Sequence, residues 1–216
     1  MSTNSKSYGL ALHSSSPELG LAINNFQGDK RCQTWNLGRE LSTQLHLYLS
    51  EFLLPQSFSD LSLIAVAKGP GSFTGTRMGV VTARTLAQQL NLPLFAISSL
   101  EAKAWQIIKD ENISKSSMIA LQMPAQRGQL FVAIYRINSQ PHQDLISVLP
   151  DTVMSSEDWQ DVLNQQQTDY QLIKIEGGLG NTASSLLELA DSKYSQGNSP
   201  HWSEALPFYG QHPVKI

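Results

Sequence analysis

Charged residues are scarce in this sequence, and neither sign dominates. Of its 216 residues, 15% are Asp, Glu, Lys or Arg, and the formal net charge at pH 7 is −3. A protein that binds nucleic acid tightly on its own neutralises phosphates with clustered Lys and Arg side chains. The composition therefore gives no support for direct, tight binding of RNA or DNA by this chain alone.

Cysteine and long apolar runs are scarce too. The single Cys32 cannot form an intrachain disulfide, which fits a reducing compartment, and it is more typical of a small, partly buried side chain than of a nucleophile. The apolar runs are too short to span a bilayer and residues 1–7 are polar, so we expect a cytoplasmic protein without membrane contact. A hydrophobic content of 41% is enough for a substantial core.

Between residues 61 and 90 the sequence contains a strand, a glycine-rich turn and a helix. Residues 61–66 form a short apolar run with β-branched members, which is typical of a strand covered on both faces. A Gly-Pro-Gly turn at residues 69–71 ends that run, and Ser72 is placed to cap a helix that begins at Phe73. We expect the rest of the chain to be arranged around this unit.

Small side chains recur every four residues along the predicted helix. Gly75, Gly79, Ala83 and Ala87 share one face, which is almost bare backbone. Each interior glycine costs a helix about 1 kcal/mol relative to alanine, so the close approach of another element must compensate. The pattern leaves open whether that element, most naturally a helix, belongs to the same chain or to a second molecule.

A phosphate cradle is an alternative reading of the same turn, because backbone N–H groups at a helix N-terminus bind anions. A P-loop requires Lys and then Ser or Thr after its last glycine, whereas Gly75 is followed by Thr76 and Arg77. The dinucleotide fingerprint fails as well, since Thr74 stands where a third glycine is needed. Only a generic anion site remains as an alternative.

The order of predicted elements divides the chain into two lobes of similar design. Both passes along the chain begin with three strands and continue with alternating helices and strands, which indicates an α/β fold with two mixed sheets. We expect an N-terminal lobe over residues 1–110 and a smaller C-terminal lobe over residues 111–216, with the polar segment 110–117 as the boundary and the last residues packing back on the first lobe. The predicted strands are 8–12, 19–23, 31–37, 61–66, 94–97, 118–123, 129–137, 145–149 and 171–175; the predicted helices are 41–53, 73–90, 100–108, 155–165 and 181–190.

The segment that follows the strand at 61–66 carries a resemblance to a known family. Residues 68–79 read KGPGSFTGTRMG, followed by Leu-Pro at 92–93 and Ser-Ser-Leu at 98–100. This run closely resembles the TsaB family, also called YeaZ, of bacterial tRNA threonylcarbamoyladenosine biosynthesis. The similarity covers the first half of the chain well and extends more loosely through Arg127-Gly128 to Pro207 and Tyr209.

The resemblance implies the two-lobed fold of actin, the heat-shock chaperones and the sugar kinases. It also implies a non-catalytic partner subunit that binds and activates TsaD, the paralogue that transfers the threonylcarbamoyl group to adenosine 37 of tRNA. TsaE is a further implied partner, and tRNA contact is implied only through the complex. In the absence of TsaD we expect a homodimer, and we expect ATP or ADP only at the level of the complex.

For the small-residue face, the resemblance favours contact with a second molecule over contact within the chain. The expected interface comprises Leu45, Leu49, Phe73, Gly75, Met78, Gly79, Ala83, Leu86 and Ala87. The family-motif loop comprises Gly69, Pro70, Gly71, Ser72, Thr74 and Arg77. Arg77 either holds this loop in place or meets a carboxylate of the partner, and the structural role is favoured.

The sequence departs from the family at two positions that bear on catalysis. His13-Ser14-Ser15 stands where TsaB relatives commonly have Asp-Thr-Ala, and Pro124-Ala125-Gln126 where they have Asp-Ala-Arg. In kinase-like proteins of this fold an acidic residue on the first hairpin of each lobe holds magnesium-bound water beside the phosphates. Both departures argue against ATP turnover by this chain.

Metal ligation and nucleotide binding have little support elsewhere. TsaD is expected to hold its metal with two histidines four residues apart, whereas the corresponding helix here offers only His46. We therefore expect no catalytic residue, metal site or cofactor in the isolated chain. Gly177 and Gly178 are either a plain strand-to-helix turn or a residual nucleotide-contacting turn. The alternatives are a kinase-like ATPase, a glycoprotease-type peptidase homologue, and a divergent homodimer with a changed role.

Overall fold

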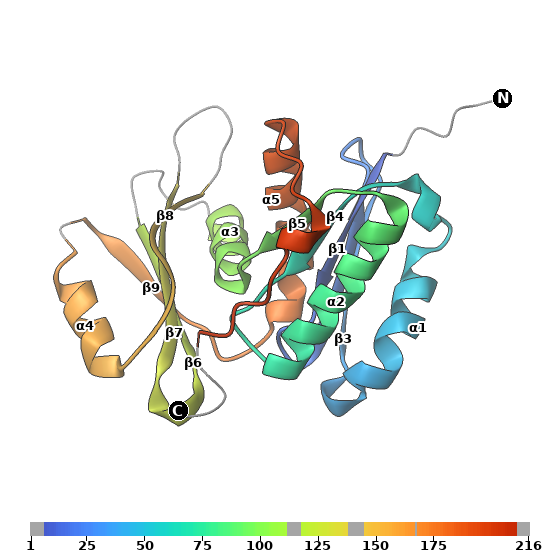
Figure 1. Cartoon of the computed structure of the whole chain (residues 1–216). Coiled ribbons are helices and arrows are strands. Elements are labelled where there is room, and N and C mark those ends of the chain that lie inside the picture. Colours follow the sequence, from blue (N-terminus) through green and yellow to red (C-terminus); the bar gives the residue numbers. More distant parts are fainter. Residues whose placement is uncertain (1–6, 112–117, 138–144, 167, 211–216) are drawn as a thin grey trace.

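The chain folds into two lobes, each built on one mixed β-sheet (Figure 1). The computed structural model describes residues 7–111, 118–137, 145–166 and 168–210. The strands of the first lobe are β1 (Tyr8–His13), β2 (Glu18–Asn24), β3 (Lys30–Asn36), β4 (Leu61–Ala67) and β5 (Leu94–Ile97), and those of the second are β6 (Met118–Pro124), β7 (Leu130–Ile137), β8 (Leu145–Met154) and β9 (Tyr170–Lys174). The helices are α1 (Leu41–Leu53), α2 (Phe73–Leu90), α3 (Ser99–Glu111), α4 (Ser156–Asn164) and α5 (Ala183–Ser195).

The two sheets share one strand order, which confirms the expectation of two related mixed sheets. The first sheet has the order β3-β2-β1-β4-β5 and the second has the order β8-β7-β6-β9, so the second repeats the first without its last strand. In each sheet the first three strands are antiparallel neighbours, and the fourth runs parallel to the first. The predicted α/β class and the position of the first hairpin are therefore right.

The first sheet is covered on both faces, and this explains why its central strands are apolar at nearly every position. Leu10 and Leu12 of β1 pack on the face covered by α1 and α2, while Ala11 packs on the face covered by α5. Strand β4 follows the same alternation, with Ile64 on the first face and Ala65 on the second. A strand buried on both faces lacks the polar alternation of a half-exposed strand.

Helix α3 lies between the two sheets (Figure 1). Its Leu100 and Ala104 pack against the second sheet, whereas Ala102 and Trp105 pack on the first-lobe side against α5. The other face of the second sheet is covered by α4, whose Trp159 is 2% exposed. The contact between the lobes is therefore an apolar core with α3 at its centre.

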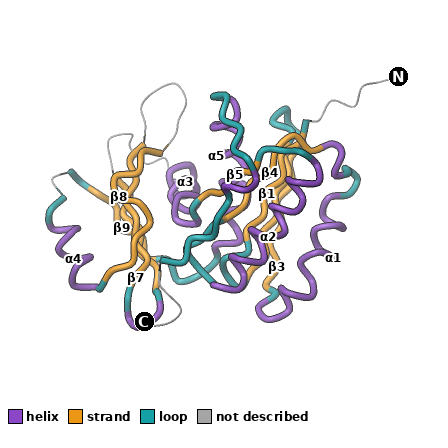
Figure 2. Tube along the Cα trace, viewed as in Figure 1, coloured by secondary structure: helices purple, strands orange, loops and turns teal. Residues whose placement is uncertain are grey.

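Segments from the second half of the chain complete the first lobe. Helix α5 packs its Leu186 and Leu187 on the first sheet, although it follows the second sheet in sequence. The loop after α5 then passes α2 and returns toward the second lobe (Figure 2). Near its end the N–H of Phe208 donates to the carbonyl oxygen of Lys68 at 2.6 Å, which ties this tail to the loop after β4. Most of the expected boundary segment, residues 112–117, lies outside the described residues.

Several helix ends fall where the sequence indicates them. The Ser72 hydroxyl accepts a hydrogen bond from the Gly75 N–H at 3.2 Å and caps α2, and Ser155 caps α4 in the same way. The predicted helix 181–190 is displaced: a 3-10 turn precedes it, and α5 runs from Ala183 to Ser195. Strand β8 also continues five residues beyond its predicted end, to Met154.

The structure also places the single cysteine and shows the character of the helices. Cys32, which we expected to be partly buried, is exposed on β3. Among the helices that the structure describes, none combines the length and the apolar character needed to cross a membrane.

Candidate functional site

The turns at the carboxyl ends of β1, β4 and β5 meet at one edge of the first sheet. These strands are parallel, so the segments 13–17, 68–72 and 98–99 emerge side by side. The Ser72 N–H donates to the Ser15 carbonyl oxygen at 2.7 Å, and the Ser99 N–H donates to the Gly69 carbonyl oxygen at 2.8 Å. These bonds lock the three turns into one surface that faces the second lobe.

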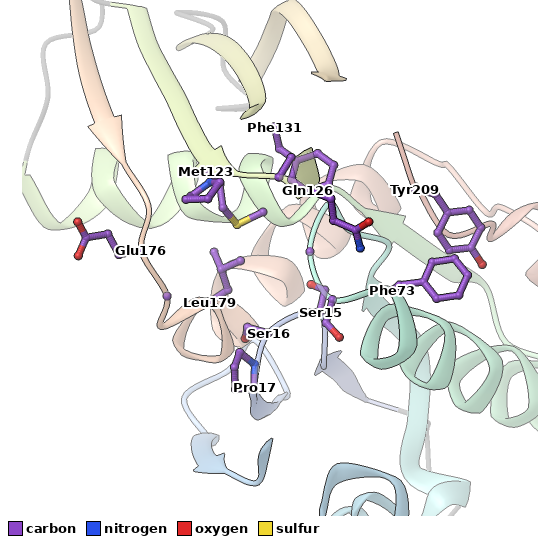
Figure 3. A pocket seen from close by; sticks show the side chains of 15 residues that line it. Ser15, Ser16, Pro17, Phe73, Met123, Gln126, Phe131, Glu176, Leu179 and Tyr209 are labelled. Carbon is purple, nitrogen blue, oxygen red and sulfur yellow. The ribbon is translucent and has the colours of Figure 1, made fainter. Parts of the chain in front are cut away.

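A cleft of about 600 Å³ lies between that surface and the second lobe. Figure 3 shows the Phe73 and Tyr209 rings at one side of the cleft and Met123 at the other. The lining residues are Ser15, Ser16, Pro17, Gly71, Ser72, Phe73, Met123, Pro124, Ala125, Gln126, Phe131, Glu176, Gly177, Leu179 and Tyr209.

The described lining is mostly apolar and carries no Lys, Arg or His side chain. The Phe73 and Tyr209 rings stack with centroids 4.8 Å apart, and Glu176 is the lone carboxylate among these residues. The Ser16 hydroxyl oxygen is buried and has no hydrogen-bond partner within the described residues. A polyphosphate needs cations or a bound metal to neutralise its charge, so this lining is better suited to an uncharged group.

His13 lies behind the cleft, inside the first lobe. Its side chain is fully buried, and its Nε2 lies 3.3 Å from the Ser15 hydroxyl, which in turn lies 2.7 Å from the Ser99 hydroxyl. Burial lowers the pKa of His13 to about 3, so the imidazole is neutral at pH 7. The end of β1 therefore carries an uncharged ring in a hydroxyl network.

Residues 124–126, the second place where the sequence departs from the family pattern, line the cleft. Pro124, the last residue of β6, and Gln126, in the turn that follows, both line it, whereas Arg127 is exposed on a 3-10 turn. The glycine turn contributes Gly177 to the lining, and Gly178 has a φ of +74° at the start of the 3-10 turn before α5. A left-handed residue at that point is the usual role of glycine in a strand-to-helix turn.

The family-motif loop is held by backbone hydrogen bonds to the neighbouring turns and by the Ser72 cap. The Arg77 guanidinium lies 5.3 Å from the centroid of the Phe73 ring and is exposed, as is Thr74. Gly71 lies against the Ser15 carbonyl group, where a side chain would not fit. The predicted loop residues therefore come together around the start of α2, next to the cleft.

The structure corrects the expectation that the small-residue face of α2 meets another molecule. Gly75, Gly79, Ala83 and Ala87 are all buried within the chain, on the side of α2 that lies on the first sheet. A Cβ atom at Gly75 would overlap the Ser14 carbonyl oxygen, and one at Gly79 would overlap the Ser14 hydroxyl. The element that packs closely against the two glycines of α2 is the turn after β1, not a helix.

Leu45 and Leu49 on α1 are corrected in the same way. Their side chains are 0% and 3% exposed and belong to the core beneath α1 and α2. Of the predicted interface, Phe73 is 40% exposed, and Met78 and Leu86 are partly buried at the edge of the core. Only these three predicted interface residues are accessible to a partner.

Sequence reasoning singled out Arg77 but missed the other residues on the outward side of α2. Val81 is 60% exposed, Arg77 and Gln88 are exposed, and Arg84 is half-buried. The helical spacing could have predicted that Val81 is exposed, because Val81 lies half a turn away from the buried Gly79 and Ala83. Leu47 of the neighbouring helix α1 is 51% exposed as well.

A buried carboxylate that joins the two lobes was also missed. The Ser98 hydroxyl, at the end of β5, donates to Asp151 Oδ1 of β8 at 2.8 Å, and the Tyr135 hydroxyl approaches the same oxygen at 3.3 Å. Burial raises the pKa of Asp151 to about 6, against the opposing effects of the Ser98 hydrogen bond and the Lys68 charge. Ser98 and Asp151 lie 53 residues apart, so no local pattern could have paired them.

Within the described part of the chain, no three His, Cys, Asp or Glu side chains gather as metal ligands would.

Comparison with known proteins places these features in a family. A sequence model of the family described as "TsaD: tRNA N6-adenosine threonylcarbamoyltransferase" matches residues 49–183. The tRNA threonylcarbamoyladenosine biosynthesis protein TsaB of Bacillus subtilis is 38% identical over 107 residues, which are 50% of this chain and 43% of that protein. TsaB of Buchnera aphidicola from Schizaphis graminum is 35% identical over 86 residues, 38% of each chain. The chain thus matches less than half the length of these curated relatives.

A solved structure shows the same fold over nearly the whole chain. YeaZ from Pseudomonas aeruginosa superposes with a TM-score of 0.76 at 21% identity, covering 94% of this chain and 99% of that one. At that identity the likeness establishes the fold, and it agrees with the pair of mixed sheets described above.

Proposed function

This chain belongs to the TsaD family of tRNA N6-adenosine threonylcarbamoyltransferases, and we propose that it is a TsaB-type partner subunit within that family. In this role it binds TsaD and activates it for threonylcarbamoyladenosine formation at position 37 of tRNA. Curated relatives named TsaB support the assignment. The chain acts by docking and performs no step of the chemistry itself.

The observation that carries this proposal is the chemistry of the turn after β1. This turn faces the cleft where kinase-like proteins of the fold handle phosphate, yet its His13 is buried and neutral. Ser15, the next polar group toward the cleft, is hydrogen-bonded within the first lobe to Ser99. The local structure therefore supports packing and a well-ordered loop at the start of α2, rather than phosphoryl transfer.

The docking surface that we propose is the outward side of α1 and α2. It includes Phe73, Met78 and Leu86 from the expected interface and adds the exposed Leu47 and Val81. Leu47 and Val81 leave more than half of their surface in water, which a partner would cover with a gain in free energy. The same surface is the candidate for self-association when TsaD is absent.

Reconstitution of the reaction tests this proposal. Threonylcarbamoyladenosine in tRNA is measured by nucleoside mass spectrometry, using TsaD and TsaE from the same organism and a supplied activated threonylcarbamoyl donor, with and without this chain. We expect modification to depend on the chain and to fall strongly with Val81→Asp. Val148→Asp is the matched control, because Val148 is 46% exposed on β8 in the other lobe. Equal modification with and without the chain would contradict the proposal.

A second candidate is small-molecule turnover in the cleft, as in a kinase-like ATPase or a peptidase. The 600 Å³ cleft and the contact between Ser15 and His13 favour it. Calorimetry with magnesium-ATP and a phosphate-release assay on the isolated chain separate the two functions. Tight stoichiometric binding with turnover would establish this second function and displace the first. ATP or ADP bound only in the TsaD complex would agree with the first.

A further inference from the structure

A buried carboxylate on β8 connects the second lobe to the first. The Ser98 hydroxyl, at the end of β5, donates to Asp151 Oδ1 at 2.8 Å, and the Tyr135 hydroxyl of β7 lies 3.3 Å from the same oxygen. Strands β5 and β8 are edge strands of different sheets and lie in different lobes (Figure 1). The three residues, called the interlobe cluster below, therefore join the edges of the two sheets.

The backbone of β8 is irregular at the residue that makes this contact. One residue of β7 lies between Val132 and Ile134. Their partners in β8 are Thr152 and Leu149, which enclose two residues, and Asp151 is one of them. Such a β-bulge re-aims the side chains beside it and is common next to functional sites. The bulge thus accompanies the contact between Asp151 and the first lobe.

The charges that face Asp151 come from several elements and compensate it only in part. Lys68, in the loop after β4, favours the ionised carboxylate, whereas the carboxylate of Glu101 on α3 opposes it. Glu101 is itself paired with Lys193 of α5 at 2.9 Å. Among the described residues, no ion pair joins Lys68 to Asp151, and β8 carries no second charged side chain. A buried charge without a close partner of opposite sign is costly.

This cost links the charge of Asp151 to the contact between the lobes. Burial raises the pKa of Asp151 from 3.8 to about 6, although the Ser98 hydrogen bond and the Lys68 charge act in the opposite direction. A carboxyl group that is exposed to water has the ordinary pKa. By linkage, contact between β8 and the first lobe favours the protonated carboxyl, and ionisation favours their separation.

We propose that the interlobe cluster is a proton-dependent latch: protonated Asp151 holds β8 against the turn before α3, and ionisation of Asp151 releases β8 from that turn. The proton passes to solvent, and no covalent bond changes. Helix α3 keeps its apolar contacts with both sheets, so the release is a local opening at the sheet edges. This inference goes beyond docking to TsaD and does not depend on it.

The latch is connected to the cleft through the turn between β5 and α3. The Ser99 N–H donates to the Gly69 carbonyl oxygen at 2.8 Å, and the Ser99 hydroxyl lies 2.7 Å from that of Ser15, which lines the cleft. His13 contacts Ser15 as well, but burial lowers its pKa to about 3, so it stays neutral above pH 5. Release of the latch by Asp151 therefore loosens the first-lobe wall of the cleft.

Hydrogen exchange measured by mass spectrometry on the full chain tests the latch, at pH values from about 5 to 7.5 and with correction for the intrinsic pH dependence of exchange. The reporter peptides cover residues 98–101 and 146–152. From the two pKa values, we expect the equilibrium constant for local opening to rise about tenfold over this range. Added urea should change reporter exchange little and that of a β4 peptide strongly, because global unfolding exposes far more surface.

Three variants separate the latch from a general effect of charge. Asp151→Asn removes the titrating group with little change in size, and we expect it to abolish the rise. Asp191→Asn is the matched control, because Asp191 is a partly buried carboxylate of α5 whose pKa is also raised by burial, and it should retain the rise. Tyr135→Phe removes a hydroxyl that favours the ionised carboxylate, so it should shift the rise to higher pH. Melting temperatures show that each variant remains folded.

The inference is overturned if the opening constant of the unmodified chain stays level from about pH 5 to 7.5, or if Asp151→Asn shows the same rise. Reporter exchange with the urea dependence of the β4 peptide would overturn it too, because the cluster would then stabilise the whole fold and have no separate opening. None of these results involves TsaD, so each leaves the proposed function intact.

Discussion

The close contact between α2 and the turn after β1 predicts a specific cost for adding one methyl group at Gly79. In Gly79→Ala the new Cβ would overlap the Ser14 hydroxyl oxygen and approach Leu12 Cδ2 to 3.0 Å. The Ser14 hydroxyl cannot rotate away freely, because it donates to the Gly75 carbonyl oxygen at 2.9 Å in a buried setting. Either that hydrogen bond breaks or α2 moves away from the sheet.

The magnitude follows from three opposing terms. Overpacking a core costs about 1–3 kcal/mol, and loss of a hydrogen bond costs roughly 1 kcal/mol more. Replacing an interior helical glycine by alanine returns about 1 kcal/mol. We therefore expect Gly79→Ala to lower the free energy of unfolding by about 1–3 kcal/mol, which for a chain of this length lowers the melting temperature by about 2–4 °C per kcal/mol.

Urea denaturation of Gly79→Ala, Ser14→Ala and the double variant measures this cost and its cause. If the Ser14 hydroxyl is the obstacle, Gly79→Ala is less costly in the Ser14→Ala background, because the nearest remaining Ser14 atom lies at 3.5 Å. Gly177→Ala is the control, since no atom lies within 4 Å of a Cβ built there. Equal or higher stability of Gly79→Ala would refute the intrachain contact and restore the small-residue face as a surface for a partner.

Three further predictions concern stability and ionisation. Asp151→Asn should be more stable than the unmodified chain at pH 7.5, by up to about 3 kcal/mol. The reason is that the raised pKa, about 6 against 3.8, makes ionised Asp151 unfavourable in the folded state. The advantage should fall to about 1 kcal/mol near pH 4.5 and disappear only below pH 3.8, where Asp151 is protonated in the unfolded chain as well as in the folded one, and paired urea titrations across this range check this. The His13 imidazole should stay neutral down to pH 5, because burial holds its pKa near 3, and a histidine NMR titration that shows protonation between pH 5 and 7 would contradict the buried placement. Ser72→Ala should lower the free energy of unfolding by about 1 kcal/mol through loss of the α2 cap, and an unchanged urea midpoint would show that the cap contributes nothing.

The sequence predicts the elements of this fold well where local chemistry determines them. The apolar run at 61–66 and the cap at Ser72 are signals contained within a few neighbouring residues. The repeated order of strands and helices then predicts two mixed sheets. Helix α5 shows the limit, because its start after a 3-10 turn and its place on the first sheet depend on contacts made across the whole chain.

The candidate site depends more on distant contacts than the fold does. The spacing of Gly75 and Gly79 reveals that something approaches α2 closely, but the approaching group is Ser14, which lies 61 residues from Gly75 and is a turn rather than a helix. The bond between Ser98 and Asp151 is equally remote in sequence. His13 was recognised as unusual because of its position, and its neutral state follows only from its complete burial.

The central claim is that this chain acts by docking to TsaD and not through chemistry of its own. The most direct measurement titrates the chain into a fixed amount of TsaD, with TsaE and substrates present, and follows threonylcarbamoyladenosine formation in tRNA. We predict stimulation that saturates as TsaD becomes fully bound, that Val81→Asp abolishes, and that Ser15→Ala in the cleft leaves intact. Loss of stimulation by Ser15→Ala in a folded variant that still binds TsaD would contradict the account.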